Sequence, residues 1–103
     1  MKQTCPICGY KTLDARCGWD ICPVCFWEDD VLIIDTDKSS PANGGLKVSE
    51  AQANYIVFRC CSRKHVTDVR EPRPDEERDP VWQPLSEAFS LAESLRSDGN
   101  SRH

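Results

Sequence analysis

The sequence contains no long apolar segment. No run approaches the roughly 20 residues that a membrane-spanning helix needs, and the first residues, Met1–Cys5, show no apolar stretch of the signal-peptide type. Excess positive charge is also missing, because 13 Lys and Arg against 17 Asp and Glu give a net charge of −4. This balance argues against a protein held mainly by nucleic-acid phosphates or anionic lipid. We therefore expect a cytoplasmic protein that does not enter a membrane.

Cysteine, in contrast, is abundant, with seven in 103 residues. A chain of this length forms one small domain and buries a smaller fraction of its surface than a large one, so a cross-link would help to stabilise it. Thiols stay reduced in the cytoplasm. Grouped cysteines there bind a metal more often than they form disulfides.

The composition divides this single domain into segments. Residues 1–48 hold five of the cysteines and a polar loop, and residues 63–83 are rich in proline and charge. Such proline density excludes a regular helix and predicts a tether lying over the surface. Helices are predicted at 49–62 and 84–98. The predicted fold is small α+β, with a zinc-ribbon-like N-terminal half of short antiparallel strands, one central helix and a C-terminal helix.

Local signals mark the ends of these elements. Ser49 followed by Gln52 is a capping box that would begin the central helix. Pro84 would lie in the first turn of the last helix, and Gly99 would stop it. The short β-branched run Val31–Ile34 predicts a buried strand.

Four cysteines form two copies of one motif. Cys5-Pro-Ile-Cys8 and Cys22-Pro-Val-Cys25 each place two thiols three positions apart across a tight turn, with proline fixing φ after the first cysteine. Two such turns brought side by side would direct four thiolates at one point. Four thiolates in a tetrahedron suit one Zn²⁺ ion, and they leave no open coordination position for catalysis. Four thiolates and one zinc carry a formal charge of −2, so the bound ion would make the chain more acidic.

Three other uses of these cysteines compete with zinc. Rubredoxin-like iron sites have similar turns, but their pairs lie further apart, and their second turn normally closes with glycine where this chain has Phe26. A thioredoxin-like redox pair needs only one such motif, at the start of a helix. A disulfide framework requires an oxidising compartment, for which the sequence gives no sign.

The remaining cysteines carry weaker signals. Cys17 lies between the two pairs beside Gly18, where it could be an exposed free thiol. Cys60 and Cys61 are neighbours on the predicted central helix, and free cysteine commonly packs as a small buried apolar residue. His65 could complete a second metal site with them. Alternatively, His65 is a solvated residue in a basic patch.

Charged side chains suggest two further sites. Glu28, Asp29 and Asp30 follow the last cysteine of the second pair and could hold a divalent metal or a basic partner, or could form a solvated edge that discourages sheet pairing. Nucleic acid could bind a local basic set despite the overall acidic charge. That set consists of Arg59, Arg63, Lys64, Arg70 and Arg73.

Longer motifs around the cysteines resemble a known family. Cys5-Pro-x-Cys-Gly-Tyr-Lys-Thr-Leu and Ile21-Cys-Pro-Val-Cys-Phe-Trp-Glu-Asp-Asp are similar to the cysteine-rich CPCC domain family of bacterial proteins. The resemblance covers about residues 4–77 and leaves the C-terminal helix outside. Ile7 departs from the family pattern, which has a third cysteine there. The resemblance implies a small zinc-ribbon-like fold and assigns no reaction.

The function predicted from these features is binding. No nucleophile and base can be paired from the sequence, so we expect a zinc-stabilised protein-binding module without catalysis, of an immunity, antitoxin or regulatory type, whose acidic face meets a basic partner or toxin. Two alternatives stay open. One is a metal-dependent, nuclease-like enzyme that uses Glu28, Asp29 and Asp30, and the other is a nucleic-acid-binding zinc ribbon.

Overall fold

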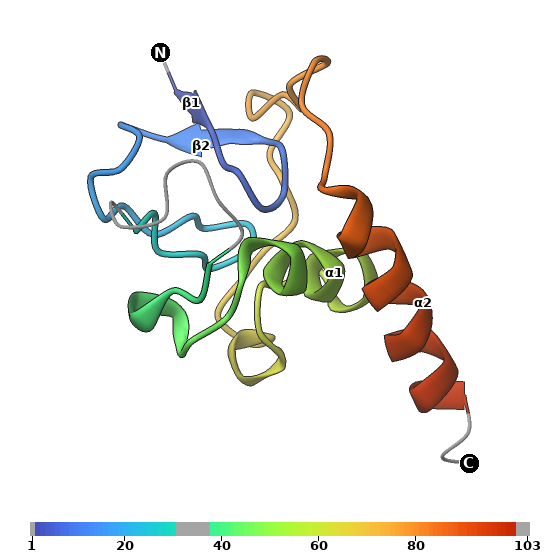
Figure 1. The fold of residues 1–103 in the computed structure, drawn as a ribbon. Coiled ribbons are helices and arrows are strands. Elements are labelled where there is room, and N and C mark those ends of the chain that lie inside the picture. The colour runs from blue at the N-terminus through green and yellow to red at the C-terminus, as the bar shows by residue number, and fades with distance from the viewer. Residues whose placement is uncertain (1, 31–37, 101–103) are drawn as a thin grey trace.

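The computed structural model describes residues 2–30 and 38–100 (Figure 1). The described chain is a small α+β structure with a two-stranded antiparallel sheet near the N-terminus and two α-helices after it. The predicted strand at 31–34 lies outside the described residues.

The sheet is a short hairpin around the first cysteine pair. Strands β1 (Gln3–Thr4) and β2 (Lys11–Leu13) run antiparallel, with a bulge between Gln3 and Thr4. The residues between the two strands form the first cysteine turn. A bulge increases the local twist of a strand, so the hairpin wraps around the turn that it carries.

Helix α1 covers Val48–Phe58 and begins one residue before the predicted 49–62. The predicted Ser49 cap is wrong, because Lys47 occupies the N-cap position. The Glu50 carboxylate accepts a hydrogen bond of 2.8 Å from the backbone N–H of Lys47. This bond is one half of a capping box, and it places an acidic side chain near the positive end of the helix dipole.

The same helix ends four residues before the predicted boundary. Arg59 adopts a left-handed backbone conformation (φ 64°) and donates its N–H to the carbonyl oxygen of Tyr55 at 2.9 Å. A left-handed residue terminates an α-helix and turns the chain aside. Cys60 and Cys61 therefore lie in the turn after α1 and not on the helix.

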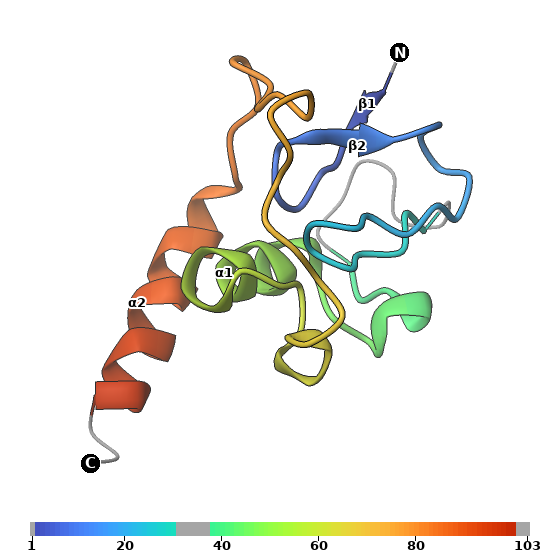
Figure 2. The same ribbon diagram turned by 180° about the vertical axis from the view of Figure 1, so that it is seen from behind.

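The proline-rich segment 63–83 begins with a short 3-10 turn, η2 (Arg63–His65), and then returns to the strands. Figure 2 shows it passing in front of α1, on the face away from the viewer of Figure 1, to reach β2. The backbone N–H of Lys11 donates to the carbonyl oxygen of Glu77 at 2.9 Å. This segment is thus attached to the sheet by a main-chain hydrogen bond.

Helix α2 covers Ser86–Asn100, whereas the prediction was 84–98. Its entry is fixed from outside the helix, because the backbone N–H of Leu85 donates to the side-chain oxygen of Gln52 at 2.8 Å. Gly99 lies within the helix and does not stop it, since α2 continues to Asn100. No described helix is long and apolar enough to cross a bilayer.

The core joins the cysteine turns to both helices. Helix α2 packs against α1 through the small residues Ala88 and Ala92, which are buried (Figures 1 and 2). The opposite face of α1 covers the cysteine turns. Buried side chains of this central cluster include Ile7, Leu13, Val24, Trp27, Ala51 and Tyr55, together with the cysteines of both pairs.

Candidate metal centre

The four paired cysteines meet at one buried point. The sulfur atoms of Cys5, Cys8, Cys22 and Cys25 all lie within 4.8 Å of one another, and all four residues are buried. Cys5 and Cys25 sulfurs are 3.6 Å apart, and Cys8 and Cys22 sulfurs are 3.8 Å apart. A zinc tetrahedron with bonds of about 2.3 Å has edges of about 3.8 Å. The donor set and its spacing therefore fit one Zn²⁺ ion.

The two turns that carry these sulfurs share one backbone pattern. In the first knuckle (residues 5–10), Cys5 N–H donates to the carbonyl of Tyr10 and Gly9 N–H donates to the carbonyl of Cys5, at 2.9 and 3.0 Å. In the second knuckle (residues 22–27), the equivalent bonds measure 2.9 and 2.7 Å. The spacing of the two motifs thus folds into a pair of matching turns.

The fourth residue after the first cysteine is left-handed in both knuckles. Gly9 has φ 80° and Phe26 has φ 71°. This conformation costs a non-glycine residue about 1–2 kcal/mol. The ring of Phe26 packs against His65, with ring centroids 4.4 Å apart. Phe26 thus departs from the glycine usual in rubredoxin turns without changing the turn itself.

The surroundings of the sulfurs favour a bound cation. Burial raises the pKa of the Cys5 and Cys25 thiols, because the apolar interior disfavours a charged thiolate. The hydroxyl of Thr12 lies 3.0 Å from the sulfur of Cys22. Four thiolates gathered here would repel one another, and a divalent cation would remove that cost.

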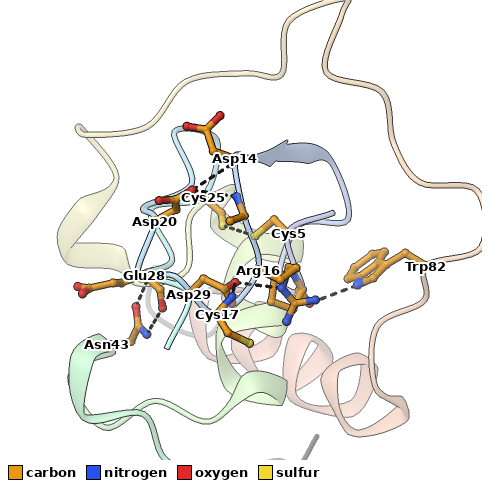
Figure 3. A network of polar contacts seen from close by, with 12 residues as sticks. Cys5, Asp14, Arg16, Cys17, Asp20, Cys25, Glu28, Asp29, Asn43 and Trp82 are labelled. Atoms are coloured by element: carbon orange, nitrogen blue, oxygen red, sulfur yellow. Dashed lines mark hydrogen bonds and ion pairs between the residues drawn. The ribbon is translucent and has the colours of Figure 1, made fainter. Parts of the chain in front are cut away.

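Asp29 is not part of a solvated edge, which corrects one of the two predictions for the acidic run. The residue is only 1% exposed. The carboxylate accepts hydrogen bonds from the side chain of Arg16 (3.0 Å) and from the backbone N–H of Cys17 (2.5 Å), as Figure 3 shows. Asp29 thus holds the loop between the two knuckles.

Asp30 and Glu28 connect the second knuckle to the loop before α1. The Asp30 carboxylate is 1% exposed and accepts a hydrogen bond from the hydroxyl of Ser40 at 2.7 Å. Asn43, in the 3-10 turn η1 (Pro41–Asn43), exchanges two hydrogen bonds with the backbone of Glu28, of 2.9 and 2.8 Å (Figure 3). Over residues 2–30 and 38–100, the cysteine group alone brings three or more metal-binding side chains together.

Cys60, Cys61 and His65 are not members of this group of four, although Cys61 packs in the same buried cluster. Cys60 donates from its sulfur to the carbonyl oxygen of Ser62 at 3.0 Å, and the backbone N–H of Cys61 donates to the carbonyl oxygen of Cys25 at 2.7 Å. Both side chains are buried, and burial raises the pKa of Cys61 to about 12. The imidazole of His65 lies 3.3 Å from the carboxylate of Asp68 and packs against the ring of Phe26. It does not form the predicted second metal site with Cys60 and Cys61.

The predicted basic patch is largely engaged within the chain. The guanidinium of Arg63 lies over the ring of Phe58 at 4.9 Å, and Arg70 forms an ion pair of 2.7 Å with Glu76. Arg59 lies over the ring of Tyr55 at 4.6 Å. Arg70, whose guanidinium is paired with Glu76, has fewer N–H groups free for phosphates, whereas stacking alone leaves the N–H groups of Arg59 and Arg63 available.

The sequence did not predict that Gln52 of α1 connects the first knuckle to the start of α2. Its amide nitrogen donates to the carbonyl oxygen of Pro6 in the first knuckle at 2.9 Å, while its oxygen accepts from the N–H of Leu85. Thr12 and Asn43 were missed in the same way. Their partners lie far away in the sequence, so no local pattern signals these contacts.

Comparison with known proteins supports the family resemblance alone. No curated protein and no solved structure matches the chain. The family described as cysteine-rich CPCC matches residues 3–76, which contain both knuckles and α1. This match covers more than half of the sequence and stops before α2. The chain therefore belongs to the cysteine-rich CPCC family.

Proposed function

We propose that the protein is a zinc-stabilised binding module in which Cys5, Cys8, Cys22 and Cys25 hold one structural Zn²⁺ ion. The observation that carries this proposal is the cluster of four buried sulfurs within 4.8 Å of one another. The bound ion would offset half of the thiolate charge and join the two knuckles into a zinc-ribbon-like half. Because four protein ligands leave no open position, the ion would stabilise the fold and not act on a substrate.

Metal analysis of the purified chain tests this assignment. We expect one zinc per chain, together with loss of circular dichroism when a strong chelator is added, because a structural zinc supplies on the order of 10 kcal/mol of folding free energy. Restoring zinc should restore the signal. Iron in place of zinc, or full structure without any metal, would refute the proposal.

The binding part of the proposal concerns a basic protein partner. Four thiolates and one Zn²⁺ add −2 to the chain's formal charge of −4, giving about −6. Apolar side chains exposed next to and along α2 add a surface suited to protein contact, namely Val81, Leu85, Phe89 and Leu91. We propose a cytoplasmic role in bacteria of the immunity, antitoxin or regulatory type, since a basic toxin or enzyme would complement this charge.

Capture of partners from a bacterial host tests the second part. The zinc-loaded chain should retain a basic protein that dissociates as salt rises. The Val81→Ser/Leu91→Ser double variant should lose it, whereas the exposed Ser97→Ala control should not. Recovery of nucleic acid with a steep loss at high salt would instead favour the nucleic-acid-binding zinc ribbon. Equal recovery by both variants would contradict a role for the exposed apolar residues.

A further inference from the structure

A second site lies outside the cysteine centre. A cavity of about 230 Å³ opens between the first knuckle, α1 and the start of α2. Aromatic and cationic side chains dominate its polar lining, namely Tyr10, Tyr55, Arg59, Arg78 and Trp82. Arg78, Trp82 and α2 lie beyond the family match. This cavity therefore depends on a part of the chain that the family pattern does not describe.

Tyr55 lines this cavity, but its hydroxyl is closed off from the open space. The residue is only 5% exposed, and its hydroxyl oxygen is buried without a hydrogen-bond partner among the described residues. A buried hydroxyl without a partner is unfavourable and is uncommon in folded proteins. A ligand in the cavity would therefore contact the Tyr55 side chain without reaching its hydroxyl.

Two arginines bring positive charge to the same cavity. The guanidinium of Arg59 lies 4.6 Å from the ring centroid of Tyr55, and that of Arg78 lies 5.3 Å from the ring of Trp82. Stacking on a ring fixes the plane of a guanidinium and leaves its N–H groups directed outward. Arg59 forms one ion pair of 3.4 Å with Glu71, between two side chains that are at least half exposed, and such a pair is weak. Arg78 has no ion pair within the described chain.

The ring contacts decide which class of anion fits. Trp82 has Arg78 over its ring, and the same ring lies so close to Gly9 that a Cβ there would approach it to 2.3 Å. A nucleobase would therefore find little open ring surface for stacking. A carboxylate needs only the outward N–H groups of the two arginines.

The remaining residues that line the cavity indicate the size and polarity of the uncharged part of the ligand. Ile56, Pro84 and Phe89 contribute apolar surface to the cavity. Its volume lies below the usual range for drug-sized ligands, which begins at about 300 Å³. We propose that this cavity binds a small organic carboxylate, whose charged group meets Arg59 and Arg78 while its apolar body lies against Phe89 and Ile56.

Calorimetric titration of the full chain as isolated, with its metal content measured in parallel, tests the proposal. The probe is phenylacetate, with phenylacetamide as its neutral isostere and inorganic phosphate as an anion without an apolar body. We expect saturable binding of phenylacetate at millimolar concentrations or below, and binding of phenylacetamide at least about tenfold weaker, because the charge-assisted hydrogen bonds are lost. Phosphate should neither bind as tightly nor displace the probe.

Variants separate this site from a general anion effect. Arg78→Gln should weaken phenylacetate binding at least about tenfold, whereas Arg73→Gln, which removes a charge outside the cavity, should leave it unchanged. Tyr55→Phe should leave phenylacetate binding unchanged and should not lower the melting temperature of the free chain, because it removes only a buried hydroxyl that has no partner among the described residues and is closed off from the cavity. Absence of saturable binding, equal binding of the amide, tight binding of phosphate, or unchanged binding by Arg78→Gln would overturn the proposal.

Discussion

The indole ring of Trp82 lies where any side chain at position 9 would begin. A Cβ placed on Gly9 would come within 2.3 Å of the ring, and Gly9 itself has φ 80°. The indole nitrogen of Trp82 also donates to the carbonyl oxygen of Pro6 at 3.3 Å. The segment before α2 is therefore seated directly on the first cysteine knuckle.

The first prediction concerns Gly9→Ala, with Gly45→Ala as its matched control. Gly45 has a similar φ of 84°, but a Cβ there would meet no atom within 4 Å. The control should lose about 1 kcal/mol of unfolding free energy from the left-handed backbone alone. Gly9→Ala should lose about 1–3 kcal/mol more, because the rigid ring of Trp82 must move. Urea denaturation of both variants measures the difference.

A double-mutant cycle with Trp82→Ala identifies the cause. Removing the indole should reduce the cost of Gly9→Ala to that of Gly45→Ala, since only the backbone term remains. If Gly9→Ala costs the same with and without the indole, the close approach of Trp82 to Gly9 does not limit the residue at position 9.

The second prediction distinguishes the cysteines that are proposed zinc ligands from the buried cysteines outside the cluster of four. Cys22→Ser should abolish stoichiometric zinc binding and unfold the N-terminal half, because one of four proposed ligands is lost. Cys60→Ser is the matched control, since its sulfur bonds only to the carbonyl oxygen of Ser62. The control should keep one zinc per chain, and its cost of about 1–2 kcal/mol should reflect the burial of a hydroxyl alone. Equal loss of zinc by both variants would contradict the assignment of the ligands.

Local patterns in the sequence predicted the cysteine cluster and the two helices. The knuckles could be anticipated because Cys-Pro-x-Cys spacing and the turn that it forms span only six residues. The ends of α1 could not, since its cap uses Glu50 and its termination uses a left-handed Arg59, a conformation that sequence propensity does not assign to arginine. Gly99 misled the prediction for α2 because glycine permits a left-handed stop without requiring one.

Burial of the acidic run could not be read from the sequence either. Carboxylates are rarely buried unless they are paired, and the partners of Asp29 lie 12 and 13 positions earlier, at Cys17 and Arg16. Such pairings depend on the folded arrangement of the chain and leave no local signal in the sequence. Likewise, the contacts of Gln52 with Pro6 and Leu85 span 46 and 33 positions.

The third prediction tests the structural role of Asp29. Asp29→Asn keeps the shape of the side chain but removes the charge that accepts from Arg16 and Cys17, so it should cost about 1–3 kcal/mol of unfolding free energy. Asp14→Asn is the control, because Asp14 pairs with Lys2 at an exposed position and should cost less than about 1 kcal/mol. Denaturant titration in the presence of zinc measures both. Similar values for the two variants would show that the buried carboxylate does not stabilise the loop.

The fourth prediction concerns the pH dependence of the Arg70–Glu76 pair. Both carboxylate oxygens of Glu76 accept from the guanidinium of Arg70, at 2.7 and 2.8 Å, and one also accepts from the backbone N–H of Arg73. The hydrogen bonds from Arg70 lower the pKa of Glu76 below its ordinary value of 4.5. A carboxyl group whose pKa is lower in the folded state stabilises the fold above its unfolded pKa, and this contribution disappears as pH falls through the folded pKa.

Comparison with Glu76→Gln isolates this contribution, because zinc release in acid affects both proteins alike. At pH 7 the variant should be less stable by about 1–2 kcal/mol, and the difference should hold above about pH 5 and shrink below 4.5. Glu71→Gln, which removes the exposed partner of Arg59, should cost less than about 0.5 kcal/mol. Unfolding measured from pH 7 down to pH 4 gives both differences. A Glu76→Gln difference that stays constant or grows in acid would mean that the ionised carboxylate is not what joins the proline-rich segment to Arg70.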